Sequence, residues 1–366
     1  MFSNANAKQA DMCRFCWMCR HICPVAGATG SEGWGPRARG LMVSMIERGT
    51  AYDTEIADAM YHCSMCDACA NDCVTGWRPT DFIREARMLA LVNDIAPDAI
   101  MKEIDNILAR GNIYGLQTDA ELKKLLSGLP EKAETLVFLG QTGRTLGAQT
   151  AIAFLKTLEQ SGVSFFVLRE EKPSGAYLAD LMGYTGEVQQ LAAETAQQIR
   201  ATGARTLVAL NPYDAVMFRD LYAQWQLLPE IRVLSAPAFL AGLIEEGIVA
   251  VSPLSLRASL QEPVKLTRGL DETEPLLAIV RALGIDLAPM FLNGKMSRCI
   301  GTPLLDGYDA NAVRQMTRVR FSDVRRTGSS VLIACSPDDI CLLRKYAPED
   351  ITVCDLFALV YENLKK

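Results

Sequence analysis

The sequence predicts an α+β multidomain protein, in which a mainly helical N-terminal domain precedes two related α/β modules with parallel sheets. Eight of the twelve cysteines fall before residue 74, and from about residue 130 short β-rich runs alternate with helical segments. The region after residue 130 also contains a duplication of ~115 residues, within the usual size of a domain. At 366 residues the chain is too long for one ordinary core. We expect four segments: 1–93, a helical linker 94–129, and modules at 130–248 and 249–366.

The composition is that of a folded, acidic protein. Apolar residues make up 49% of the chain and charged residues 22%, as in ordinary globular proteins. The net charge of −6 and the isoelectric point near 5.2 argue against nucleic acid as a partner. We find no apolar secretion signal in the first residues and no run close to the roughly 18 apolar residues of a membrane-spanning helix. We therefore expect a cytoplasmic protein that reaches the inner face of a membrane only through partners.

Two cysteine ladders with the same spacing lie in the N-terminal segment. They are Cys13-Arg-Phe-Cys-Trp-Met-Cys-Arg-His-Ile-Cys23 and Cys63-Ser-Met-Cys-Asp-Ala-Cys-Ala-Asn-Asp-Cys73, and both read C-x2-C-x2-C-x3-C. Three thiolates on one tight loop can hold three corners of an iron–sulfur cube, while the fourth, at the start of a following helix, points to the neighbouring cube. The spacing therefore predicts two 4Fe-4S clusters that transfer electrons. The expected ligands are Cys13, Cys16, Cys19 and Cys73 for the first cluster, and Cys63, Cys66, Cys69 and Cys23 for the second.

Disulfides and structural zinc are the alternatives for these cysteines. Disulfides are not expected in the cytosol, which keeps thiols reduced. Zinc sites usually pair one C-x2-C with a distant C-x2-C or with histidines, which leaves no use for a third closely spaced cysteine. The two histidines, His21 and His62, each lie beside a ladder, and we expect them to be loop or surrounding residues rather than ligands.

Helical patterning follows each ladder. Apolar residues recur at helical spacing in 31–46 and 78–92, so we expect helices that brace the cluster loops. Four arginines in these segments could offset cluster charge or steer a partner, or could be ordinary solvated charges. They are Arg37, Arg39, Arg84 and Arg87.

The rest of the chain repeats an α/β pattern. When its two halves are aligned, Asn211 falls on Cys335 and Asp214 falls on Asp338. We expect a strand at 264–266 that corresponds to the first strand of the earlier module. The other β-rich runs, expected to form largely parallel sheets, are 135–139, 164–168, 206–210, 231–234, 331–334 and 351–353.

The two ladders, the motif Gly35-Pro-Arg-Ala-Arg-Gly40 and the duplicated module together resemble a known group of iron–sulfur subunits. These subunits join a two-cluster ferredoxin-like domain to two cysteine-rich CCG domains. The group includes the catalytic subunit of heterodisulfide reductase, the glycolate oxidase iron–sulfur subunit, the corresponding subunit of the anaerobic glycerol-3-phosphate dehydrogenase and the lactate-utilisation iron–sulfur protein. The resemblance is strong over 13–91 and rests on spacing and strand pattern over 130–366. It implies an electron-transfer subunit with a flavoprotein (FAD) dehydrogenase as its partner.

The cysteines of the CCG domains are largely missing. Where such domains carry a lone Cys, a Cys-Cys-Gly and a Cys-Pro-x-Cys, the first module has Gly140-Gln141, Pro173-Ser174-Gly175 and Asn211-Pro-Tyr-Asp214. We expect no metal there, because amides and hydroxyls are poor ligands for cluster iron. The second module keeps thiols that could hold a cluster or zinc with one outside ligand, although free buried cysteines are common and we favour the metal-free interpretation. The residues of this candidate third site are Cys299, Cys335 and Cys341.

Three hypotheses for the function follow. In the first, a chain without its own catalytic site passes single electrons between a flavoprotein dehydrogenase and a further acceptor, which is a quinone or another redox subunit. The flavin would lie on another polypeptide, because Gly140-Gln-Thr-Gly143 lacks the rest of a dinucleotide fingerprint. In the second, the chain is a catalytic disulfide or heterodisulfide reductase subunit with a C-terminal cluster, which the missing cysteines argue against. In the third, the α/β modules are an assembly surface for a larger complex.

Overall fold

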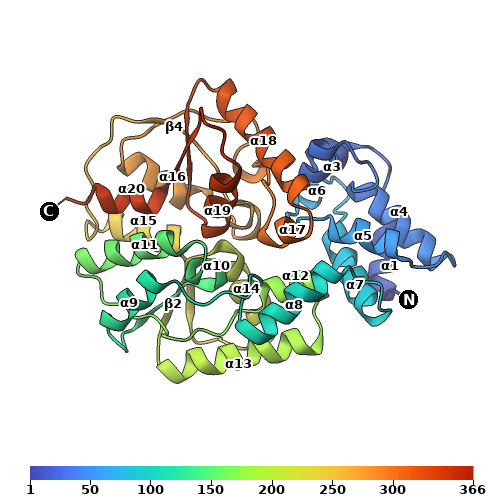
Figure 1. Ribbon diagram of the computed structural model, residues 1–366, viewed down its shortest axis with the longest axis horizontal. Helices are drawn as coiled ribbons and strands as arrows, with labels where there is room; N and C mark the ends of the chain where they lie inside the picture. The colour runs from blue at the N-terminus through green and yellow to red at the C-terminus, as the bar shows by residue number, and fades with distance from the viewer. Residues whose placement is uncertain (366) are drawn as a thin grey trace.

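The N-terminal part of the protein is a set of short helices around the two cysteine ladders, as the computed structural model of residues 1–365 shows (Figure 1). Three of these helices begin at a proline, Pro24, Pro36 or Pro79, where the missing N–H has no helical partner to lose. The helices are α1 (Asn4–Asp11), α2 (Met18–Ile22), α3 (Pro24–Thr29), α4 (Pro36–Glu47), α5 (Thr54–Tyr61), α6 (Ala68–Asn71) and α7 (Pro79–Val92).

The first α/β module contains a three-stranded parallel sheet in the order β1-β2-β3. Its strands confirm three of the predicted runs. The fourth run, 164–168, forms only a bridge from Phe166 to Leu136, because the carbonyls of Leu168 and Arg169 accept hydrogen bonds from the Arg144 guanidinium instead. Two helices precede the sheet. The elements are α8 (Asp98–Arg110), α9 (Ala120–Gly128), β1 (Thr135–Phe138), α10 (Gly140–Arg144), α11 (Ala148–Gln160), α12 (Ala176–Met182), α13 (Gly186–Thr202), β2 (Thr206–Ala209), α14 (Pro212–Gln224), β3 (Arg232–Ser235) and α15 (Ala236–Glu245).

The second α/β module contains a four-stranded parallel sheet in the order β5-β4-β6-β7. The predicted strand at 264–266 is wrong. The strand lies earlier, and Pro263, which has no N–H to donate to a ladder, stands before a π-helical turn. The elements are β4 (Arg257–Leu260), η1 (Lys265–Gly269), α16 (Thr273–Ala282), β5 (Asp286–Leu287), η2 (Gly294–Met296), α17 (Pro303–Tyr308), α18 (Ala310–Arg326), β6 (Val331–Ala334), α19 (Pro337–Tyr346), β7 (Thr352–Asp355) and α20 (Leu356–Glu362).

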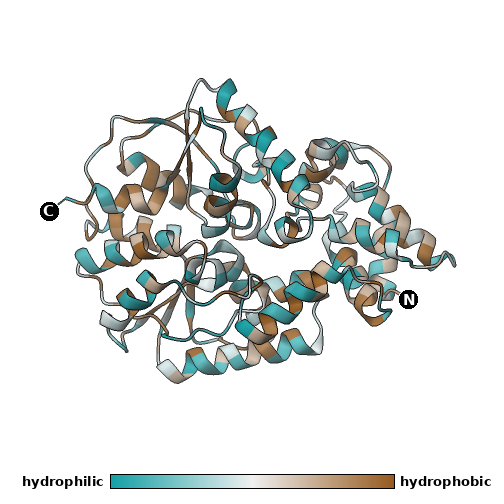
Figure 2. Cartoon of the chain, viewed as in Figure 1, coloured by the Kyte–Doolittle hydropathy of each residue, from teal (hydrophilic) through white to brown (hydrophobic). Residues whose placement is uncertain are grey.

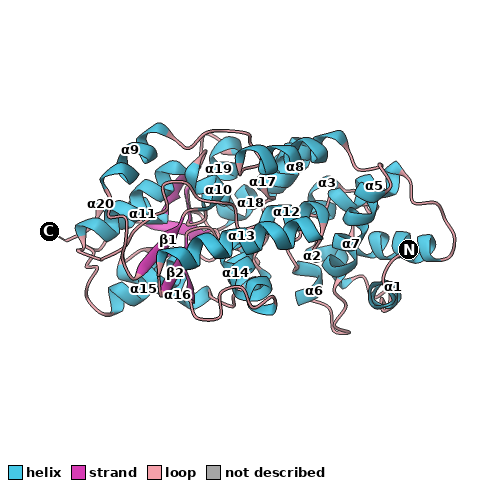
Figure 3. Ribbon diagram, turned by 90° about the horizontal axis from the view of Figure 1, so that it is seen from below, coloured by secondary structure: helices cyan, strands magenta, loops and turns pink. Residues whose placement is uncertain are grey.

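The two modules share one hydrophobic core. Leu139 and Phe154 of the first module belong to the same buried cluster as Ile333 and Phe357 of the second, and the rings of Phe154 and Phe357 lie 4.9 Å apart. Helices such as α15 and α16, next to the sheets, are strongly hydrophobic, whereas the outer helix α13 alternates in character (Figure 2). The strands lie in the half of the molecule away from the N-terminus, with helices on both sides (Figure 3). The modules therefore support each other through this shared cluster, and each module also contributes most of a further buried cluster.

One buried carboxylate, Asp180 on α12, joins the N-terminal domain to both modules. It is 3% exposed, and it forms ion pairs with Arg84 of α7 at 3.1 Å and with Lys265 of η1 at 3.8 Å. Tyr213 of α14 donates to its second oxygen at 2.5 Å. Burial alone would raise the pKa of Asp180, but Lys265 and Arg84 hold it below its ordinary value. The charge is therefore retained where three parts of the chain meet.

We expect Asp180→Asn to destabilise the protein by about 3 kcal/mol, because removing one partner of a buried ion pair leaves the other charges uncompensated. Chemical denaturation followed by circular dichroism measures this change. The control is Asp105→Asn, an exposed carboxylate on α8, which should change the stability by less than ~0.5 kcal/mol. Equal stabilities for the two variants would show that Asp180 does not hold the three parts together.

Candidate metal centre

The backbone follows the same path through both cysteine ladders. In each, the residue two positions after the first cysteine and the residue after the second cysteine adopt left-handed conformations, and a short helix then begins. The N–H of Phe15 lies 3.4 Å from the sulfur of Cys13, and the N–H of Met65 lies 3.4 Å from the sulfur of Cys63. Left-handed non-glycine residues cost of order 1–3 kcal/mol each and cluster at functional sites. The left-handed residues are Phe15, Trp17, Met65 and Asp67.

The thiols of the two ladders fall into neighbouring groups. Burial raises the pKa of Cys19 to about 11, and the thiols nearest to it act in the same direction. Cys69 is also buried, and neighbouring thiols of its own ladder and of Cys23 raise its pKa further. The groups brought together are Cys19 with Cys13, Cys16, Cys73 and Cys23, and Cys69 with Cys63, Cys66 and Cys23. Cys23 thus lies between the ladders, next to the thiols of the second.

A small cavity fits an iron–sulfur cube at the second ladder. Four cysteines line it, and so does Arg39, which is 1% exposed and donates to the Ala59 carbonyl at 2.6 Å. A terminal nitrogen of Arg39 has no partner among the described residues, and its charge lowers the pKa of Cys23 against the effect of burial. A thiolate-bound cube is anionic, so an unpaired buried cation beside it suits that cofactor. The four cysteines are Cys23, Cys63, Cys66 and Cys69.

A single metal ion fits the same residues less well. Zinc needs four donors at about 2.0–2.3 Å from one point, and within residues 1–365 no three Cys, His, Asp or Glu side chains are arranged to hold one ion. A cube instead spreads its ligands over separate corners. The ring of His62 stacks on that of Trp34, with 3.7 Å between their centres, and its Nε2 forms a hydrogen bond with the Asp309 carboxylate at 3.1 Å. His21 is exposed.

The predicted arginines differ in role. Arg87 is 3% exposed and donates to the carbonyls of Met60, Tyr61 and Cys63, the last at 2.6 Å. Arg87 and Arg39 are therefore neither solvated charges nor available to steer a partner, since burial removes both from the surface. Arg37 lies 3.3 Å from the ring of Trp17 and is the arginine nearest the exposed edge of the first ladder.

The second module reaches the second ladder with groups that the sequence did not reveal. Lys265 donates to the Met65 carbonyl at 2.8 Å, and Arg268 donates to the Cys66 carbonyl at 2.7 Å. Cys299 lies 3.6 Å from the Ser64 hydroxyl. A hydrogen bond between Cys299 and Cys66 lowers the pKa of Cys66, whereas burial raises it; the charge of Arg268 also lowers it. These contacts join positions about 200 residues apart in sequence, so no local signal could have found them.

The candidate third site gains no support from contacts among the described residues. Cys299 faces the second ladder, whereas Cys335 belongs to the core shared by the modules. Cys335 has Asp339 and Asp355 as its charged neighbours. The prediction of a site formed by Cys299, Cys335 and Cys341 remains untested.

The comparisons with known proteins agree with this geometry. Residues 9–77, which contain all eight ladder cysteines, match the family described as "4Fe-4S dicluster domain". The chain is 22% identical over 97% of its length to a subunit of the dihydromethanophenazine:CoB–CoM heterodisulfide reductase of Methanosarcina mazei, covering 94% of that protein. It is 23% identical over 48% of its length to the glycolate oxidase iron–sulfur subunit of Escherichia coli, covering 50% of it.

The chain is thus similar to iron–sulfur subunits of oxidoreductases, and its residues 9–77 match a 4Fe-4S dicluster domain. A further relative is a probable membrane-anchored ferredoxin of Chromohalobacter salexigens, 27% identical over 80% of this chain. This chain spans 46% of that relative's length. Within residues 1–365, no helix is both long enough and apolar enough to cross a membrane. Similarity to iron–sulfur subunits of oxidoreductases implies electron transfer as the general role of the chain.

In this chain, hydrogen-bonded polar side chains occupy the positions that cluster cysteines hold in CCG domains. Ser174 donates to Asp214 at 2.5 Å, and Asn211 donates to the Tyr177 hydroxyl at 3.2 Å. Tyr177 in turn donates to Asp338 of the second module. Burial raises the pKa of Asp214 to about 8, so this carboxyl is neutral at neutral pH. The network therefore joins the two modules through hydrogen bonds between polar side chains.

We expect Arg268→Gln to lower the reduction potential of one cluster by on the order of tens of millivolts, because a cation beside a cluster favours its reduced, more negative form. Redox titration followed by electron paramagnetic resonance measures this shift. Arg281→Gln, at an exposed ion pair of the same module, is the matched control and should leave both potentials unchanged. Unchanged potentials in Arg268→Gln would exclude an electrostatic role for this residue.

We expect the protein to lose stability as pH rises from about 4 to 9, in part through Asp214. In the unfolded chain this carboxyl ionises above its ordinary pKa of 3.8, whereas in the fold it keeps its proton up to about pH 8. Its contribution is therefore complete below pH 3.8 and is lost as pH rises through 8. Asp214→Asn mimics the neutral acid and should have a flatter melting temperature profile between pH 6 and 9. A profile parallel to wild type would contradict the assignment.

Proposed function

We propose that the chain holds two 4Fe-4S clusters and passes single electrons between a partner flavoprotein dehydrogenase and a further acceptor. The observation that carries the proposal is the identical path of the two ladders, each with a thiol loop closed by left-handed residues and an N–H directed at a sulfur. The proposed ligands are Cys13, Cys16, Cys19 and Cys73 for the first cluster, and Cys63, Cys66, Cys69 and Cys23 for the second.

We propose that the flavoprotein docks at the first ladder. Cys16 is exposed, and Phe15 and Met18 beside it are each 50% exposed. Apolar side chains gathered on the surface commonly mark a site of protein contact. Arg37, stacked on Trp17, adds a cation to this edge. An electron could thus enter or leave the first cluster over a short path.

The second cluster is proposed to lie inside the protein, covered by the modules. Three of its proposed ligands, Cys23, Cys66 and Cys69, are buried, and side chains of η1 cap the loop that carries them. The electron therefore moves inward from the first cluster to the second, or in the opposite direction. The modules provide surroundings for the clusters and no cluster of their own.

An iron and acid-labile sulfide assay on anaerobically purified protein should find about eight irons per chain. Cys16→Ser should lose about half of this iron, together with the spectrum of one cluster, because a cube deprived of one thiolate is held weakly. Cys354→Ser, at a half-buried cysteine in β7 with no proposed role, is the control and should keep all of it.

Twelve or more irons would restore a third cluster and the reductase interpretation. Zinc in place of iron, or full iron in Cys16→Ser, would overturn the ligand assignment.

A further inference from the structure

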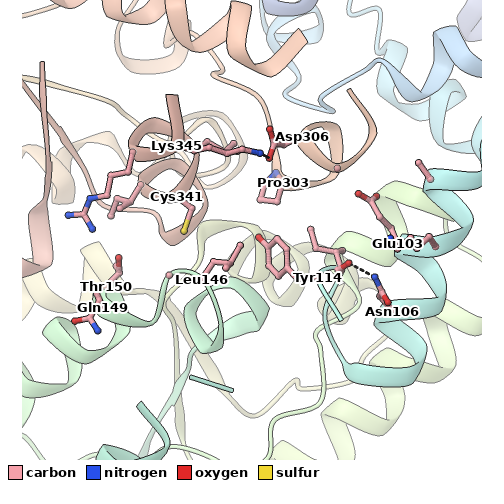
Figure 4. Close-up of a pocket in the computed structure, with 18 residues that line it drawn as sticks. Glu103, Asn106, Tyr114, Leu146, Gln149, Thr150, Pro303, Asp306, Cys341 and Lys345 are labelled. Carbon is pink, nitrogen blue, oxygen red and sulfur yellow. Dashed lines mark hydrogen bonds and ion pairs between the residues drawn. The ribbon is translucent and has the colours of Figure 1, made fainter. Parts of the chain in front are cut away.

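A cavity of about 730 Å³ lies between the two modules and linker helix α8, and its volume is within the range of small-molecule sites. Figure 4 shows side chains from α8, the loop after it, the start of α11, α17 and α19 around one space. Leu146, Ile113 and Ile340 contribute apolar walls. The Lys345–Asp306 ion pair, at 2.6 Å, closes one side. The cavity therefore offers apolar walls, and the other cations that line it, Lys102 and Arg344, are exposed to solvent.

Glu103 brings an unpartnered carboxyl into this cavity. It is 6% exposed, and one of its oxygens has no partner among the described residues. Burial raises the pKa of Glu103 to about 8, although Arg87 opposes the shift. At neutral pH the group is thus an O–H donor without an acceptor. An orphaned donor in an apolar cavity indicates a ligand that carries an acceptor oxygen.

Tyr114 supplies a second hydroxyl, backed by a chain of proton-carrying groups. Its O–H lies 3.0 Å from the Thr142 hydroxyl, which lies 3.5 Å from the Tyr177 hydroxyl. Tyr177 donates to Asp338, which has an oxygen without a partner among the described residues. Burial raises the pKa of Asp338 as well. A chain of hydroxyl groups thus links Tyr114 to the buried carboxyl of Asp338.

One guanidinium connects the cavity with the second cysteine ladder. The cation that acts on Glu103 is Arg87, and the same guanidinium donates to the Cys63 carbonyl at 2.6 Å. Helix α17, which forms one wall of the cavity, ends at Tyr308. The Tyr308 hydroxyl donates to Asp58, and its ring lies 4.9 Å from the ring of His62, which precedes Cys63 in the sequence. A ligand here would lie near the proposed second cluster.

We propose that this cavity binds a quinone, which exchanges electrons with the second cluster. The inference rests on the proposed function and names the class of its small-molecule acceptor. A quinone is a neutral ring with two carbonyl oxygens, so Glu103 and Tyr114 each donate to one of them while the apolar walls hold the ring. A neutral ring needs no counter-charge inside the apolar walls, and the cations Lys102 and Arg344 keep their contact with solvent.

The reduction balances with the groups present. The quinone takes two electrons, one at a time, and the clusters are oxidised by the same two electrons. Each carbonyl oxygen takes one proton, from Glu103 on one side and from Tyr114 on the other, and the product is the quinol. Glu103 recovers its proton from water, and Tyr114 recovers its own from water through the Thr142 hydroxyl, with which it shares a hydrogen bond. Oxidation of a quinol runs through the same steps in reverse.

Equilibrium dialysis of the whole chain with decylubiquinone tests the proposal. The wild-type chain should bind about one molecule, and Glu103→Leu and Tyr114→Phe should each weaken binding at least tenfold, since each loses one hydrogen bond to the ligand. Asp105→Leu, the same kind of change at an exposed position of α8 outside the cavity, should bind as the wild type does. Glu103→Gln keeps N–H donors and should bind within threefold, yet reduce the quinone at least tenfold more slowly because it supplies no proton.

Iron content measured on the same samples separates this proposal from the proposed function. Absence of quinone binding by a chain with full iron would overturn the quinone site and leave electron transfer standing. Unweakened binding by Tyr114→Phe and Glu103→Leu would also overturn it. Quinone binding by a chain without iron would instead refute the proposed function.

Discussion

The rest of the structure depends on one set of hydrogen bonds, in which three cationic side chains donate to backbone carbonyls of the second cysteine ladder. Arg87 donates to Cys63, Lys265 to Met65 and Arg268 to Cys66. Arg87 comes from the N-terminal domain and the other two from η1, so the ladder is held from both sides. Backbone donation leaves the thiols free for iron while adding positive charge to their surroundings. Asp180 keeps two of these cations in place, through the Lys265 ammonium and through its own carbonyl, which accepts from Arg87 at 2.6 Å.

Polar side chains join the two α/β modules. The network runs from Ser174 to Asp214 and from Asn211 through Tyr177 to Asp338. One of its carboxyls, Asp214, is buried, and burial raises its pKa to about 8. The same network backs the cavity proposed to bind a quinone.

The parts that the sequence could predict are those fixed by local spacing. The ladders, most strands and the helices after Pro36 and Pro79 follow from short patterns. Phe166 forms only a bridge, because a distant arginine captures neighbouring carbonyls. The roles of Asp180, Lys265 and Arg268 depend on contacts between residues from about 80 to 200 apart and have no local signature. The position of Cys299 beside the Ser64 hydroxyl likewise depends on folding, because the two residues are 235 positions apart in sequence.

Electron paramagnetic resonance of the fully reduced chain tests the central claim most directly. Two cubes closed by exchanged fourth ligands within one small domain should give a spectrum broadened by spin–spin interaction, and its integral should approach two spins per chain. A sharp, uncoupled signal that integrates to one spin would contradict the account.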